Sequence, residues 1–277
     1  MSLARFFRIL LRLLAVVVLT VVTQVGGIIY VLFIPFRPLF KKMFPERKQR
    51  VWAKVGAFSL FYLIITFLIL PLIAKPFGRV PLPLSGNLKP LNYFTAVLNR
   101  HYVRPQLKDL LQDSADKMEE KYPGTVIAYM DANLPFMKGF PLLPHLSHSD
   151  GKKADIAFFY KDAESGETLH RTARNFMGYG GSDLPRKGEL DKAANCVRQG
   201  YWQYDIMSRF MPTTSEEKMA LDEKRMKAYV RILVNDSRTG KILLEPHIKQ
   251  RLKLNYNKVR FHGCRAVRHD DHLHVQL

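Results

Sequence analysis

Two long segments without charge stand out in the pattern of apolar and polar residues near the start of the chain. Residues 13–36 form the first segment and residues 55–74 the second. A helix needs about 20 apolar residues to cross the hydrocarbon core of a bilayer, which is roughly 30 Å thick. Both segments meet this requirement, so we predict that residues 1–75 form a membrane anchor with two transmembrane helices.

The first apolar segment is interrupted by Gln24, Gly26 and Gly27. Glycines let helices approach each other closely, so we expect this helix to pack against the second one. A cleaved signal peptide is the alternative for this segment. A transmembrane span is favoured for two reasons. The apolar stretch is longer than that of a signal peptide, and no cleavage motif of small residues follows it.

Basic residues surround the two segments unevenly. The loop between them has one acidic residue, Glu46, against seven basic ones: Arg37, Lys41, Lys42, Arg47, Lys48, Arg50 and Lys54. Three arginines precede the first segment, and Lys75 and Arg79 follow the second. Basic loops remain in the cytoplasm, so we predict a cytoplasmic loop with both chain ends outside. In a Gram-negative cell the C-terminal domain would then lie in the periplasm, beside the cytoplasmic (inner) membrane.

The formal net charge of +19 is also typical of proteins that bind nucleic acid. Ten of the 43 Lys and Arg residues precede Val55, however, where membrane topology explains them. The rest of the chain contains no nucleic-acid-binding motif. We therefore predict the lipid bilayer or an anionic wall polymer as the partner of the basic surface, and no nucleic acid.

Residues 76–90 are rich in proline, glycine and leucine. Proline fixes φ and lacks an N–H donor, so this segment is predicted to be an extended tether. The folded domain is predicted to cover residues 91–277.

Within that domain, helical and alternating patterns follow one another. Helices are predicted over residues 94–118 (with a break near Arg104), 106–121, 216–227 and 246–254, strands over 125–130, 154–160, 229–234 and 272–277, and a long loop over 171–192. The mixture predicts an α+β fold with a small, mainly antiparallel sheet, flanking helices and long loops.

Six of the nine histidines fall in two short windows. The first contains His145, His148 and, seven residues after His148, Asp155; the second contains His262, His269, His272 and His274. Zinc in hydrolytic sites takes three such nitrogen or oxygen ligands and leaves a fourth position for water. The clustering therefore predicts one Zn²⁺ per chain.

Local geometry supports this prediction. Gly151 can adopt the positive φ that lets the loop after His148 turn back towards Asp155. His272 and His274 are two residues apart on a predicted strand, so both point to the same face. One of them can bind the metal while the other stands beside the bound water. Residues expected to orient the ligands are His145, His269, Asp270 and Asp271.

Only two cysteines are present, Cys196 and Cys264, which are too few for a disulfide scaffold. They could pair in an exported domain or remain buried thiols in a cytosolic one. The sequence leaves this open.

The two histidine windows resemble a known superfamily of zinc peptidases. The matching residues are Ser147-His148-x-x-Gly151-x-x-x-Asp155-Ile156 with His145 before them, His269-x-x-His272-x-His274-Val275, and the segment from Arg231 to Lys249 between them. The superfamily contains D-alanyl-D-alanine peptidases, lysostaphin-type endopeptidases and the hedgehog amino-terminal domain. The chain is most similar to its penicillin-insensitive murein endopeptidases, over residues 125–277.

This resemblance implies His148, Asp155 and His274 as zinc ligands and His272 as the catalytic base, with His145 and His269 lining the site. It also implies hydrolysis of peptide cross-links in peptidoglycan. The chain departs from the family at Lys152 and Lys153, which follow the motif glycine, and at residues 265–267, where the family has aromatic residues.

Two other functions are compatible with these residues. One is a non-catalytic zinc module that recognises a cell-wall component or a protein partner, as hedgehog-like domains can be. A structural zinc ion would have a fourth protein ligand, whereas in a hydrolase the fourth coordination position is left to water. The other is a membrane scaffold without metal, which would make the histidine clustering coincidental.

Overall fold

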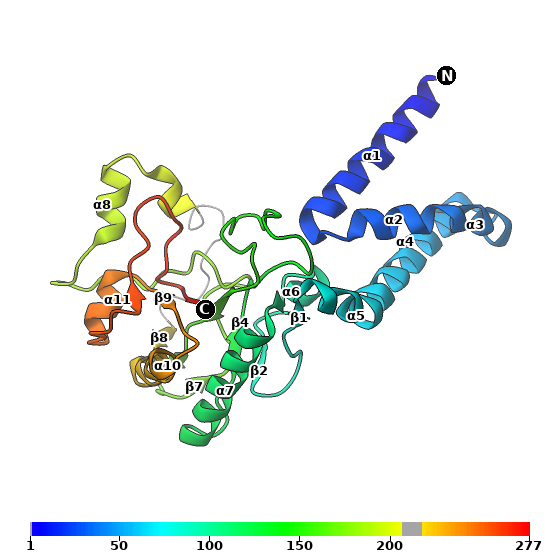
Figure 1. Cartoon of the computed structure of the whole chain (residues 1–277). Coiled ribbons are helices and arrows are strands. Elements are labelled where there is room, and N and C mark those ends of the chain that lie inside the picture. The colour runs from blue at the N-terminus through cyan, green and yellow to red at the C-terminus, as the bar shows by residue number, and fades with distance from the viewer. Residues whose placement is uncertain (1, 207–217) are drawn as a thin grey trace.

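The computed structural model describes residues 2–206 and 218–277, and in it a helical arm leads into a mixed α+β domain (Figure 1). The arm contains α1 (Leu3–Thr23), α2 (Gly26–Phe33), α3 (Arg37–Met43), α4 (Arg47–Ile64) and α5 (Leu70–Ala74), joined in part by short 3-10 turns at Ile34–Phe36 and Lys75–Phe77 and a π-helical turn at Ile65–Ile69.

Two stretches of the arm are long and apolar enough to cross a membrane, Arg5–Thr23 and Arg47–Phe77. The second contains the predicted span 55–74. The prediction of one continuous helix over residues 13–36 is wrong, because the chain reverses at Gln24, whose φ is 66°. The first candidate span is therefore displaced towards the N-terminus.

The glycines after this reversal explain it. A Cβ on Gly27 would lie 2.0 Å from the Thr20 Oγ1 and 2.6 Å from the Val16 carbonyl oxygen, so only glycine allows α2 to pack this closely on α1. The Gly26 N–H donates to Thr23 Oγ1 at 2.8 Å. The glycines therefore join the two halves of the first apolar segment, and not the two spans as expected.

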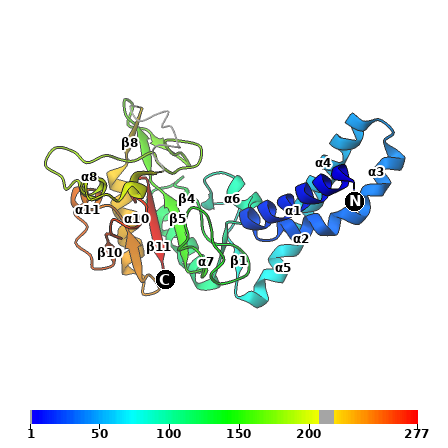
Figure 2. The same cartoon turned by 90° about the horizontal axis from the view of Figure 1, so that it is seen from above.

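The reversal also determines which ends of the arm lie together. The C-terminal ends of α1 and α5 face the domain, whereas the N-terminus and α3 lie at the far end (Figures 1 and 2). Lys54 interacts electrostatically with Arg12, Arg37 and Arg50, which come from three different parts of the arm. The basic residues of the N-terminus and of the loop thus gather at one end.

The prediction of a tether over residues 76–90 is wrong for residues 80–90. Strand β1 (Val80–Pro81) pairs with β3 (Tyr102–Val103), and β2 (Leu88–Pro90) pairs with β4 (Ile127–Tyr129). Leu82 and Leu88 are buried in the domain core. Proline is tolerated here because β2 is an edge strand of its sheet.

The main sheet has six strands in the order β10-β9-β11-β5-β4-β2, with antiparallel pairing in its centre and parallel pairs at both edges. Its other strands are β5 (Lys153–Ala157), β9 (Lys241–Leu243), β10 (Val259–Arg260) and β11 (His272–Gln276). A second sheet contains β6 (Tyr160–Asp162), β7 (Thr168–Leu169) and β8 (Met219–Leu221). Among the described residues, the domain contains the helices α6 (Phe94–Val97), α7 (Pro105–Lys121), α8 (Lys192–Arg198), α10 (Glu223–Asn235) and α11 (Pro246–Arg251), with a 3-10 turn at Trp202–Asp205.

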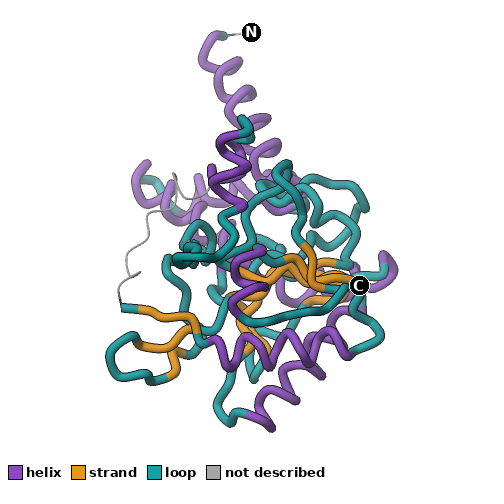
Figure 3. The backbone as a smooth tube through the Cα atoms, turned by 90° about the vertical axis from the view of Figure 1, so that its left-hand side faces the viewer, coloured by secondary structure: helices purple, strands orange, loops and turns teal. Residues whose placement is uncertain are grey.

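The two faces of this sheet have different roles. Ala154 and Ile156 of β5, with Leu273 and Val275 of β11, belong to the main hydrophobic cluster with residues of α7 and α10. Successive side chains of a strand point to opposite faces, so the alternate residues of β5 and β11 project from the other side. Figure 3 shows the strands in the middle of the domain with helices beside them. The α+β class is therefore confirmed.

One pair of predicted elements is wrong. Instead of a helix over 216–227 and a strand over 229–234, the chain forms β8 and then α10, and residues 216–217 lie outside the described residues. The Asp222 side chain accepts from the Arg225 N–H at 3.0 Å and caps the helix. Met226, Tyr229, Val230 and Leu233 are all buried, and this helical spacing outweighs the β-propensity of the segment.

We predict that Leu88→Ala lowers the free energy of unfolding by about 2–5 kcal/mol, because it opens a cavity in the core. Leu190→Ala, at a position 56% exposed, should change it by less than about 0.5 kcal/mol. Denaturant unfolding of the two variants measures the difference. Equal effects would mean that the segment before residue 91 is a tether after all.

Candidate metal centre

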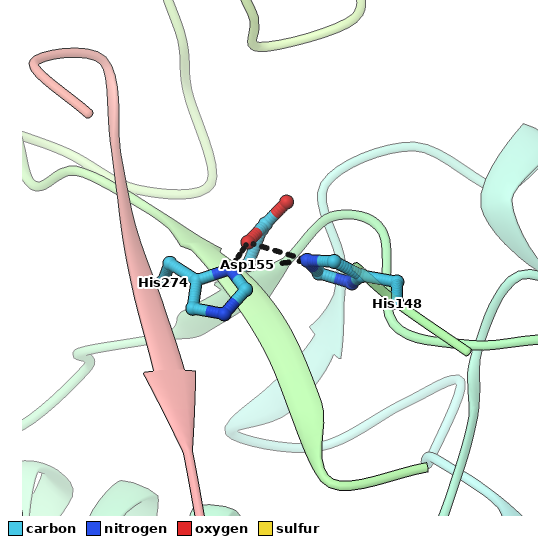
Figure 4. Close-up of side chains that lie close together, drawn as sticks. All are labelled: His148, Asp155 and His274. Atoms are coloured by element: carbon cyan, nitrogen blue, oxygen red, sulfur yellow. Dashed lines mark hydrogen bonds and ion pairs between the residues drawn. The ribbon is translucent and has the colours of Figure 1, made fainter. Parts of the chain in front are cut away.

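The candidate ligands meet because β5 and β11 are neighbours in the sheet. In the antiparallel register of this pair, His274 lies directly opposite Asp155. His148 enters from the loop before β5, and the three side chains converge (Figure 4). All three are buried, and they form a group that could hold a metal ion.

The distances within this group are short. His148 Nε2 lies 3.0 Å from His274 Nδ1 and 3.3 Å from Asp155 Oδ1, and His274 Nδ1 lies 2.9 Å from Asp155 Oδ1. Ligand atoms of a tetrahedral zinc site, with bonds of about 2.1 Å, are about 3.4 Å apart. The three atoms therefore fit a shared ion after shifts of a few tenths of an ångström.

Partners outside the group orient its members. His148 Nδ1 lies 2.7 Å from the Ala132 carbonyl oxygen, which can only accept, so this nitrogen carries the proton and Nε2 is free to bind a metal. The Tyr179 hydroxyl donates to Asp155 Oδ2 at 2.9 Å and leaves Oδ1 facing the histidines. His148 and Asp155 thus each direct a lone pair towards the Nδ1 atom of His274.

The protonation states suit metal binding. Burial raises the pKa of Asp155, but the imidazoles of His148 and His272 outweigh it and hold this pKa well below its ordinary value. Burial lowers the pKa of His274 to about 4, so its imidazole is neutral at pH 7. An anionic carboxylate beside the neutral imidazole of His274 suits a divalent cation, whose ligands must be deprotonated.

His272 stands beside this group without belonging to it. Its Nδ1 makes a short hydrogen bond with Asp271 Oδ1, and the other Asp271 oxygen accepts from the Gly180 N–H. Its Nε2 lies 3.7 Å from Asp155 Oδ1 and has no hydrogen-bond partner among the described residues. Burial lowers the pKa of His272, but the carboxylates of Asp155 and Asp271 raise it to about 9. Asp271 therefore orients His272, as expected for a residue next to the ligands.

The remaining predicted residues line the cavity above the group. The His145 Nδ1 is 3.0 Å from Asp131 Oδ2, and the His269 ring centroid is 5.0 Å from that of His272. Both belong to the lining of a cavity of about 410 Å³. Asp270, by contrast, forms an ion pair with Arg268 and takes no part in this lining.

Asp131 and Tyr179 are two residues of the centre that the sequence did not indicate. Asp131 connects His145 with Arg100. Tyr179 lies in the long loop predicted over residues 171–192. Burial raises the pKa of its hydroxyl well above the ordinary value, which keeps it a donor to Asp155. Their positions depend on long-range contacts, for which the local sequence carries no signal.

The turn at Gly151 is confirmed, with a φ of 78°. It also has a second reason to be glycine, because a Cβ there would lie 1.2 Å from Arg79 Nη1. Arg79 is 3% exposed and donates to the Ser149 carbonyl oxygen at 3.2 Å. Lys153 forms an ion pair with Asp150, and neither it nor Lys152 lines the cavity.

A disulfide holds one wall of the cavity. Cys196 of α8 is bonded to Cys264, and the next residues, 265–267, line the cavity together with Gln203 and Ile206. The pairing that the sequence left open is therefore present. Because disulfides persist in oxidising compartments, it favours an exported domain.

Comparison of the chain with protein-family models and with curated proteins found no match.

We predict that the chain binds about one zinc ion, and that His148→Ala lowers the metal content to near zero because it removes a ligand. Mass spectrometry of the metal in purified protein after equilibration with zinc measures this. His170→Ala is the control, because His170 is exposed and does not line the cavity. Normal zinc content in the His148 variant would exclude it as a ligand.

Proposed function

We propose that the protein is a membrane-anchored zinc peptidase that hydrolyses amide bonds, with peptide cross-links of peptidoglycan as substrate. The observation that carries this proposal is the buried group of His148, Asp155 and His274 with the free Nε2 of His272 beside it. The resemblance of the two histidine motifs to penicillin-insensitive murein endopeptidases supplies the substrate and a hedgehog/D-Ala-D-Ala peptidase-like fold.

His148, Asp155 and His274 would hold the zinc ion. When bound, zinc lowers the pKa of its water ligand and polarises the scissile carbonyl. Tyr179 and the Ala132 carbonyl oxygen orient the ligands, so that the donor atoms remain directed at one point. Leu146 and Leu243 form apolar parts of the cavity lining.

His272 would act as the general base. With its pKa of about 9, His272 is an imidazolium at pH 7 while the Asp155 carboxylate carries no metal; zinc held by Asp155 would offset that negative charge and lower this pKa. The neutral Nε2 could then accept a proton from a water molecule at the fourth position and later deliver it to the leaving amine. Asp271 stabilises the imidazolium that forms in between, because its carboxylate is bonded to the opposite ring nitrogen. This pairing of a carboxylate with a histidine is typical of a catalytic base.

The alternative is a non-catalytic zinc module that recognises a wall component or a protein partner. It requires a fourth protein ligand, and His272 is the residue closest to that role. Its side chain is instead held by Asp271 and lies outside the group of three. An open fourth position favours the hydrolase.

For the location, we propose the cytoplasmic membrane with the domain on its outer, periplasmic side. The disulfide and the apolar helices support this. The sequence alone placed the N-terminus outside as well. Because the chain reverses at Gln24, we propose instead that the N-terminus shares the cytoplasmic side with the basic loop, so that their positive charges lie together. This placement requires the uncharged residues 26–36 to return through the bilayer between the two spans.

We predict that His272→Ala keeps its zinc but lowers kcat/KM on cross-linked peptidoglycan fragments by about 10²–10⁴-fold, because the base is lost. Released peptides are followed by chromatography, with chelator-treated enzyme as the zero-activity reference. Undiminished turnover would remove His272 from this role, and loss of zinc would assign it to the ligands.

We also predict that Asp271→Asn moves the acidic limb of the pH–kcat/KM profile to lower pH. The Asp271 carboxylate raises the pKa of His272, and the base acts only when neutral, so loss of the charge leaves it neutral at lower pH. The same change should lower kcat by about 10–100-fold, because the imidazole loses its orienting partner. An acidic limb that stays in place would show that another group is the base.

A further inference from the structure

One wall of the metal cavity belongs to a loop that contacts the end of each candidate span. This loop, residues 134–146, is here called the lip. Its last residues, Pro144, His145 and Leu146, line the cavity. The lip therefore connects the metal centre with the arm.

The contacts with the arm involve both spans. The Phe136 N–H donates to Gln24 Oε1 at 2.7 Å, just after the first span ends at Thr23. The Phe136 ring lies 4.9 Å from that of Phe77, where the second span ends. The lip is thus fixed at the level at which both spans leave the apolar layer.

The lip also continues the apolar surface of α1. Val21 and Val22 of α1 line a small cavity of about 70 Å³ together with Leu134, Leu142 and Leu143 of the lip. Val21 and Val22 are themselves 38% and 42% exposed. Apolar side chains of the span therefore adjoin those of the lip, with Arg100 beside them.

Three large apolar side chains of the lip point to the outside. Met137 is 58% exposed, Leu143 56% and Leu146 60%. An exposed apolar patch beside a membrane span is typical of a membrane contact. Lys138, which is also exposed, can extend its ammonium group to a lipid phosphate while its stem stays among apolar groups.

We infer that the lip lies in the headgroup region of the bilayer, with Met137 and Leu143 in contact with acyl chains. This inference rests on the membrane placement proposed above, and not on hydrolase activity. One wall of the metal cavity then lies at the membrane surface.

The lip is also coupled to the metal centre. Arg100 donates to the Leu143 carbonyl oxygen at 2.5 Å and to Asp131 Oδ2 at 2.8 Å, and Asp131 holds His145. Contact of the lip with the bilayer therefore also holds His145 in place, through Arg100 and Asp131.

The test uses the full chain in phospholipid nanodiscs, with single cysteines labelled by an environment-sensitive fluorophore. The native cysteines are paired and do not react. Met137→Cys and Leu143→Cys report on the lip. Leu184→Cys and Leu190→Cys are matched controls, 58% and 56% exposed, in the loop on the side of the domain away from the arm (Figure 1). Leu68→Cys, 66% exposed within the second span, is the positive control.

With lipids that carry a nitroxide quencher high on the acyl chain, we expect labels at 137 and 143 to lose at least half of their emission, as the label at 68 does, and labels at 184 and 190 to keep theirs. Labels at 137 and 143 that behave like those at 184 and 190 would overturn the inference. Emission at 137 and 143 that shifts only as more protein is loaded per disc would also overturn it, because a second copy would then cover the lip.

These outcomes are independent of the proposed hydrolysis, since no step of the measurement requires turnover. An unquenched label at position 68 would instead refute the membrane placement on which the inference rests.

Discussion

The pairing of β5 with β11 is the constraint on which the metal centre depends. These strands are more than a hundred residues apart in sequence, and their register sets His274 opposite Asp155. A slip of β11 by one residue would turn His272 and His274 towards the hydrophobic core and Leu273 and Val275 away from it, leaving Asp155 without its partners. Ile156, Leu273 and the residues beside them are fully buried in that core, so the packing of one face enforces the geometry of the other.

The arm and the domain are built as one unit. Asn99 Nδ2 donates to the Thr23 carbonyl oxygen at 3.3 Å and to the Tyr62 hydroxyl at 3.1 Å, and that hydroxyl donates to the Val97 carbonyl oxygen at 2.7 Å. Arg79, just after the second span, also packs its guanidinium group against Gly151 of the domain. Because buried polar groups require such partners, the arm holds a fixed position on the domain, beside the loop that carries His145 and His148.

Local patterns in the sequence were sufficient for the features that depend on neighbouring residues. The alternation of His272, Leu273, His274 and Val275 predicted a strand with two imidazoles on one face, and the positive φ of Gly151 follows from its place in the turn. The spacing of His148 and Asp155 indicated the metal group. By contrast, Tyr179 and Asp131 contribute through contacts with distant segments, and no local pattern marks them. The reversal at Gln24 was missed because hydropathy records apolar content and not direction. The segment 80–90 was misjudged because its prolines sit on an edge strand, where they are tolerated.

The central claim is that three side chains hold a zinc ion and leave its fourth position to water. X-ray absorption at the zinc edge of the full chain tests it most directly. We expect two imidazole nitrogens and two oxygens at about 2.0–2.2 Å, with a spectrum that His272→Ala leaves unchanged. A third imidazole that disappears in the His272 variant would contradict the claim, because the site would then be closed by protein.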